Sequence, residues 1–163
     1  MRGAENMYIT ITDFLDKPPR PLPDATHANP WFAHWIKFQS DIVSGCALLV
    51  PSGVSIEQLR QNPALRHISV ETSQRAVKDF RLLPNTEAKS YQFEALTNPG
   101  DYDLTGEIWD LDVQEDGKIA GARVRGESCI FWLTANDFSL VRVEEGTWVR
   151  FRTLELFLHD ENL

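Results

Sequence analysis

The stretch from Leu104 to His159 limits the fold more than any other part of the chain. Its residues read LTGEIWDLDVQEDGKIAGARVRGESCIFWLTANDFSLVRVEEGTWVRFRTLELFLH. Apolar and polar residues alternate through most of it, and Gly and Asp-Gly pairs interrupt the alternation. Alternation with period two is typical of β-strands, because successive side chains point to opposite faces of a sheet. The stretch predicts three short strands, a brief helical interruption, and then one long strand or two joined strands.

The alternation also predicts which side chains of the three short strands face the core. The residues predicted to face inward are Trp109, Leu111, Val113, Ala120, Ala122, Val124, Cys129, Phe131 and Leu133. The residues predicted to face outward are Ile108, Asp110, Asp112, Arg123, Arg125, Ile130 and Trp132. A turn around Asp116-Gly117 joins the first two strands as a hairpin.

The last strand contains a conflict of parity. Val149 and Phe151 lie on one face, whereas Leu154, Leu156 and Leu158 lie on the opposite face together with Trp148. One face of a regular strand cannot hold both apolar sets. We therefore expect a one-residue bulge near residues 152–153.

The first half of the chain favours a mixture of helices and strands. Alternation predicts strands over 7–12, 67–71 and 90–95, and the apolar run at 46–50 predicts a strand buried on both faces. Four prolines within 18–23 predict an extended connector over 17–24. Ser55 and Gln58 fit the capping box of a short helix that ends before Pro63.

Two longer helices are also predicted in this half. Asn29-Pro30 is a typical helix start, and four apolar residues follow at helical spacing before Gly45: Trp31, Trp35, Phe38 and Ile42. A further helix is predicted over 74–82, where Arg75, Lys78 and Arg81 recur every three residues. We interpret these cations as a solvated face.

These elements predict an α+β fold. An N-terminal mixed α/β layer with about three helices would occupy residues 1–97, and an antiparallel, barrel-like β-rich region would occupy residues 98–163. The two regions could also form one compact domain.

The C-terminal third resembles a cold-shock or S1-like OB-fold barrel in its order of strands. The resemblance rests on residues 106–108, the Asp116-Gly117 hairpin, residues 129–132, a short element at 137–141, and residues 145–151. It implies an OB-like architecture. The second strand, which carries base-stacking aromatic residues in that family, has none between Lys118 and Arg123. Nucleic-acid binding therefore does not follow from the resemblance.

Charge is distributed unevenly along the chain, which has a net charge of -8. Residues 1–85 carry 9 Lys and Arg against 8 Asp and Glu, whereas residues 86–163 carry 7 against 16. An acidic region repels phosphate backbones and attracts basic partners. The sequence has no apolar run long enough to span a membrane and no leader-like start, so we expect a cytoplasmic protein. Cys46 and Cys129 are interpreted as reduced, buried thiols, and a disulfide between them stays open.

No sequence motif for catalysis, for metal binding or for cofactor binding is present, so the sequence suggests an interaction protein. The first hypothesis is a non-enzymatic module, comparable to an immunity or inhibitor protein, whose acidic β-half docks a basic protein partner. Its candidate contact residues are Ile108, Asp110, Asp112, Ile130, Trp132 and Trp148. For these apolar residues, packing against the N-terminal layer is an equally good interpretation.

Two alternative functions stay open. The first is binding of single-stranded nucleic acid, which the surrounding acid disfavours, with candidate contacts Arg123, Arg125, Trp132, Trp148, Arg150 and Arg152. The second is an enzyme with scattered catalytic residues, which would need a pocket that joins His27 or His34 to Cys46 or Asp110.

Overall fold

A computed structural model describes residues 7–20, 33–138 and 142–161. The described chain contains nine strands: β1 (Met7–Phe14), β2 (His34–Gln39), β3 (Ser44–Val50), β4 (His67–Leu82), β5 (Gln92–Ala95), β6 (Tyr102–Val113), β7 (Ile119–Arg125), β8 (Ile130–Thr134) and β9 (Trp148–Asp160). Its described helices are α1 (Ile56–Gln61) and one 3-10 turn (Pro63–Leu65). The predicted α+β fold with three helices is therefore wrong, because the protein is almost entirely antiparallel sheet.

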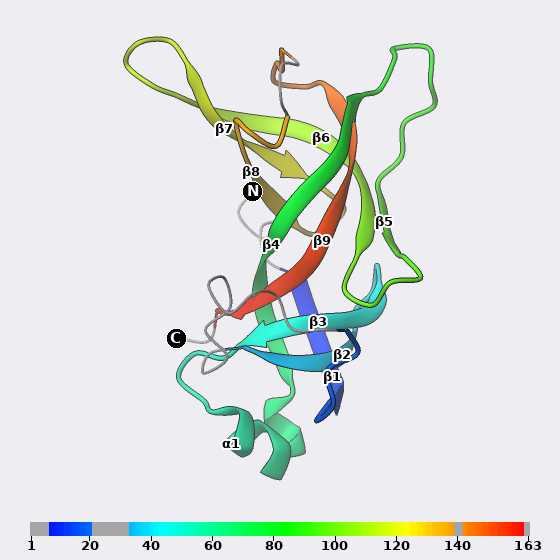
Figure 1. Ribbon diagram of the computed structural model, residues 1–163, viewed down its shortest axis with the longest axis vertical. Helices are drawn as coiled ribbons and strands as arrows, with labels where there is room; N and C mark the ends of the chain where they lie inside the picture. Colours follow the sequence, from blue (N-terminus) through cyan, green and yellow to red (C-terminus); the bar gives the residue numbers. More distant parts are fainter. Residues whose placement is uncertain (1–6, 21–32, 139–141, 162–163) are drawn as a thin grey trace.

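All strands belong to one sheet with the order β3-β2-β1-β4-β9-β6-β7-β8, and β5 pairs with β6. The long strands β4 and β9 run through the whole molecule and pair with each other (Figure 1). A parallel pairing of β3 with β9 closes β1, β2, β3, β9 and β4 into what we call the lower barrel. The upper halves of β4 and β9 continue with β6, β7 and β8 into the upper barrel. The OB-like region predicted at 98–163 is therefore not a separate barrel, because the upper barrel includes β4.

One continuous apolar core fills both barrels. Tyr102 lies where they meet, fully buried between Phe38 and Phe93, and its hydroxyl donates a hydrogen bond to the carbonyl of Cys46 at 2.5 Å. Burial raises the pKa of this hydroxyl well above its usual value. The phenol therefore stays neutral and joins strands from the two halves of the chain.

The helix predicted from residue 30 to Gly45 is wrong in its described part, which forms β2 and the start of β3. Residues 21–32, including Trp31, lie outside the described residues. Trp35 is buried on one face of β2, and Ile36 and Phe38 are buried on the other. A strand that is covered on both faces loses its polar alternation, so its apolar residues imitate helical spacing.

The helix predicted over 74–82 is the second half of β4. Lys78 pairs with Arg152 and Arg81 pairs with Arg150, so two residues of β4 stand opposite the one residue between Arg150 and Arg152. An irregularity with a left-handed residue, Asp79 at φ 56°, accounts for the extra residue. The bulge places Lys78 and Arg81 on one face, whereas Arg75 has the opposite parity from Lys78, so the three cations do not form one face.

The parity conflict in β9 is real, but it lies further along the strand than predicted. Buried residues alternate up to Glu155 and then continue on the opposite parity from Leu156. Glu155 is left-handed, with φ 56°, and the β4–β9 register runs through this point without a shift. The switch coincides with the passage of β9 from the upper barrel, where it pairs with β6, to the lower barrel, where it pairs with β3.

Several local predictions are confirmed. The capping box at Ser55 and Gln58 is present, with both reciprocal hydrogen bonds. The Asp116-Gly117 turn forms the β6–β7 hairpin, and Gly117 has the positive φ of 83° that glycine tolerates. Both cysteines are free thiols, with Cys129 buried and Cys46 half-buried. Among the described residues no helix is long and apolar enough to cross a membrane.

Candidate functional site

The outer face of β6, β7 and β8 brings together charged and aromatic side chains from three strands. Asp110 pairs across strands with Arg123, and Arg123 pairs with Trp132. A guanidinium nitrogen of Arg123 lies 3.8 Å from a carboxylate oxygen of Asp110, and both side chains are about half exposed. Direct neighbours on one sheet face interact through their side chains. Asp110, Arg123 and Trp132 therefore form one row across the sheet.

Trp132 is the large aromatic residue of this row, and 41% of its surface is exposed. Its indole ring lies over Gly121 of β7, where an added Cβ would stand 2.6 Å from the Cζ2 atom of Trp132. The missing side chain at Gly121 thus lets the indole lie along the sheet. A flat, partly exposed indole offers both apolar area and a π-face for a cation.

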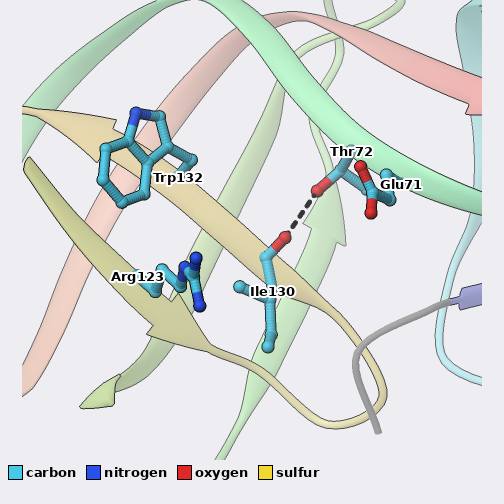
Figure 2. A pocket seen from close by; sticks show the side chains of 5 residues that line it. All are labelled: Glu71, Thr72, Arg123, Ile130 and Trp132. Atoms are coloured by element: carbon cyan, nitrogen blue, oxygen red, sulfur yellow. Dashed lines mark hydrogen bonds between the residues drawn. The ribbon is translucent and has the colours of Figure 1, made fainter. Parts of the chain in front are cut away.

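A cavity of about 320 Å³ opens beside this row, between β8 and β4. We call it the seam pocket, and its lining residues are Glu71, Thr72, Arg123, Ile130 and Trp132. Figure 2 shows that Glu71 and Thr72 come from β4 and that Ile130 and Trp132 come from β8. The Thr72 hydroxyl donates a hydrogen bond of 3.0 Å to the carbonyl of Ile130 across the opening.

Negative charge gathers near this pocket. Burial and, next, the neighbouring carboxylate of Glu71 raise the pKa of Glu161. The Glu71 side chain is exposed and lines the seam pocket, and the one cation among its lining residues, Arg123, already faces Asp110. Two carboxylates so close together favour the approach of a cation.

The structure brings four of the six predicted partner contacts to the same outer face. Asp110 and Asp112 are exposed on β6. On β8, Ile130 is partly exposed and Trp132 is exposed. Their predicted outward direction is confirmed, whereas their role in binding stays a prediction.

The predicted outward direction of Ile108 is wrong, because Ile108 is a core residue with 1% exposure. A register shift between Ile108 and Asp110 reverses the alternation, so Ile108 points into the core while Asp110 points outward. The same strand extends past the core in the hairpin seen in Figure 1. Trp109 and Val113, predicted to face inward, are therefore 37% and 56% exposed.

Trp148 is half-buried and packs on Tyr91, with ring centroids 4.9 Å apart. The arginines proposed for nucleic-acid contacts are each close to a carboxylate: Arg123 to Asp110, Arg125 to Glu107, and both Arg150 and Arg152 to Asp103. Hydrogen bonding from Arg152 contributes most to lowering the pKa of Asp103. A phosphate would have to displace these carboxylates.

The described residues named for the enzyme alternative lie in different parts of the fold. His34 lies against Arg60 and Phe14 in the lower barrel, whereas Asp110 belongs to the upper barrel. Cys46 lies on β3 opposite Lys37, three positions along β2 from His34, and burial raises the pKa of its thiol. His27 lies outside the described residues. Within the described ranges no group of three or more His, Cys, Asp and Glu residues could hold a metal ion.

No protein-family model, no curated protein and no solved structure matches this chain. The site residues that the sequence did not suggest are Glu71 and Thr72, which lie about sixty residues before β8. Alternation placed Glu71 in a predicted strand, which gives a face but not a neighbour, and Thr72 fell outside that predicted strand.

Proposed function

We propose that the protein is a non-enzymatic interaction module that binds a basic protein partner through the outer face of β6, β7 and β8. The observation that carries this proposal is the row formed by Trp132, Arg123 and Asp110 beside the seam pocket. Together with Asp112 and Glu71, this row combines an exposed aromatic anchor with three carboxylates against one guanidinium. Aromatic anchors surrounded by polar groups are typical of protein interfaces.

The charges around Trp132 define the chemistry of the partner. Asp110 and Asp112 lie on the same sheet face as the indole, Glu71 lines the seam pocket, and the guanidinium of Arg123 is shared with Asp110. A lysine or arginine of the partner can stack on the indole, and a second cation can pair with Glu71. An acidic or phosphate-bearing partner would instead meet repulsion from the same carboxylates.

Selection from a random peptide library against the full chain tests this proposal. We expect the selected peptides to be enriched in arginine and lysine, and Trp132→Ala to abolish the selection. The paired variant Asp110→Lys/Asp112→Lys should slow association strongly at low salt and less at high salt, because exposed charges are screened beyond about 8–10 Å at physiological ionic strength.

A matched control changes the same charge on the lower barrel. Asp41→Lys/Glu57→Lys alters two exposed acids there and should leave association nearly unchanged. Equal slowing by both variants would indicate an effect of net charge alone and would contradict the proposed surface. Micromolar binding of a single-stranded oligonucleotide by the unmodified protein at about 150 mM salt would also contradict it.

A further inference from the structure

The edge of β8 that faces β4 carries backbone groups outside the ladder with β7. Two backbone hydrogen bonds bracket that ladder, one from Gly126 to Cys129 and one from Ala135 to Ala120. Hydrogen-bonded and non-hydrogen-bonded residues alternate in an antiparallel pair. By this alternation Phe131 and Leu133 direct their backbone groups to β7, whereas Ile130 and Trp132 direct theirs to β4.

β4 meets this edge with side chains instead of backbone. The Thr72 hydroxyl donates to the carbonyl of Ile130, and the Gln74 amide donates to the carbonyl of Trp132, both at 3.0 Å. The spacing of two residues on both strands is that of a β-ladder. The side-chain donors thus occupy the positions where the N–H groups of another strand would stand.

We propose that the basic partner adds an extended segment to the edge of β8, and that its backbone N–H groups replace Thr72 and Gln74 as donors to Ile130 and Trp132. This inference rests on the proposed function and names its binding mode. Because an added strand needs about 4.8 Å on each side, β4 moves away from β8 together with these two side chains, and the partner supplies one hydrogen bond for each bond that is lost. Addition of a strand to a free sheet edge is an established mode of peptide recognition.

The side chains around the edge select the added segment. In an extended segment every second side chain points to the same face, about 6.6 Å from the next. One such side chain would lie over the indole of Trp132, and its neighbour in the series would lie near Ile130, on the side of the pocket where Figure 2 shows Glu71. Arginine or lysine suits both positions, because the first faces the indole and the second faces the carboxylate.

The test uses the full chain and a blocked peptide of about eight alternating arginine and valine residues. Two modified versions carry N-methyl groups, one on the arginine nitrogens and the other on the valine nitrogens. An added strand uses the donors of one edge only. We therefore expect one modified peptide to bind about tenfold more weakly than the other, as expected for two lost hydrogen bonds. Exchange of the amide hydrogens of Ile130 and Trp132 should slow about tenfold in the complex.

Three results would overturn the inference. Equal binding of all three peptides would show docking by charge alone, and the proposed function would stand without strand addition. Binding of none of them at about 50 mM salt would overturn the proposed function as well. Slowed exchange at Ile130 and Trp132 that depends on protein concentration, without peptide, would assign the edge to a second copy of the chain.

Discussion

The two barrels share β4 and β9 but are closed in different ways. In the lower barrel every neighbouring pair of strands is joined by a backbone ladder, including the parallel pair β3 and β9. In the upper barrel four strand pairs have ladders, and the fifth junction, between β4 and β8, is bridged by the Thr72 and Gln74 side chains. A ladder satisfies the backbone groups of both strands, whereas two side chains leave an edge that another chain can use.

This difference separates stability from binding within one sheet. The lower barrel has buried residues on both faces of β2 and β3, and α1 lies at its end (Figure 1). The upper barrel carries the exposed residues Trp109, Val113 and Trp132, whereas the exposed Tyr8 belongs to β1 of the lower barrel. Of these residues, Trp132 lines the seam pocket beside the open junction. The incompletely paired barrel is therefore the one that carries the proposed binding surface.

The largest expected effect tests whether the upper barrel has a core of its own. Phe131 is buried and contacts Phe93 and Phe151 edge-on. Phe131→Ala should lower the free energy of unfolding by about 3–5 kcal/mol, the usual cost of truncating a buried aromatic side chain. Arg123→Ala, on the outer face of β7, should stay near neutral. Equal denaturant midpoints for the two variants would disprove the assignment of faces.

A second prediction concerns the charges that join the two barrels at the parity switch. Arg20 contacts the carboxylates of Asp101 and Glu155, which are almost completely buried, at 2.6 and 3.8 Å. Arg20→Ala leaves these acids without that cation, although Arg75 still lies 3.1 Å from Glu155. We expect a loss of about 2–3 kcal/mol, less than for a fully buried pair because Arg20 is partly exposed.

Thermal and urea unfolding measure this loss. Lys17→Ala, in the same connector, serves as the control because no ion pair is found for it within the described residues. A loss as large for Lys17→Ala would show that the connector, and not the ion pair, matters.

Much of the upper sheet could be predicted from the sequence, because its strands alternate and its turns contain Gly. The inward direction of Phe131, the outward direction of Trp132 and the Asp116-Gly117 hairpin follow from period two alone. This reasoning fails at bulges, because one extra residue reverses the predicted face of every residue that follows it in the strand. The error at Ile108 has that origin.

The seam pocket was beyond sequence reasoning for another reason. The fold of the sheet brings Glu71 and Thr72 of β4 to Ile130 of β8, although β4 and β8 do not follow one another in the sequence. A pattern of faces predicts which side chains point together, but it does not predict which strands adjoin. The buried contact of Arg20 with Glu155 is even more distant in sequence, and no spacing could have suggested it.

A third prediction uses pH to test the lower half of β9. Burial lowers the pKa of His159, which hydrogen-bonds with Ser73 at 2.7 Å, and it also lowers the pKa of His34. A histidine whose folded pKa lies below its unfolded value of 6.5 binds protons more readily when unfolded. Its stabilising contribution is complete above pH 6.5 and is lost as the pH falls through the folded pKa.

Urea unfolding at about pH 7.5 and about pH 5.5 measures this dependence. The midpoint should fall at the lower pH in the unmodified protein and fall much less in His34→Gln/His159→Gln. An unchanged midpoint in the unmodified protein would contradict the burial assigned to the two histidines.

The smallest expected effect addresses the open junction itself. Thr72→Val keeps the shape of the side chain but removes the hydroxyl that donates to Ile130. The seam pocket gives water access to the freed carbonyl, so the cost should be about 1 kcal/mol, the net value of one hydrogen bond. Hydrogen exchange separates this effect from general destabilisation, because the amides of β8 should exchange faster while those of β2 and β3 do not change.

Thr10→Val is a matched control, since it removes a hydroxyl that bonds His67 across two strands with an intact ladder in the lower barrel. If Thr72→Val accelerated exchange in β2 and β3 as much as in β8, the junction between β4 and β8 would support the whole sheet, and the proposed separation of stability from binding would be wrong.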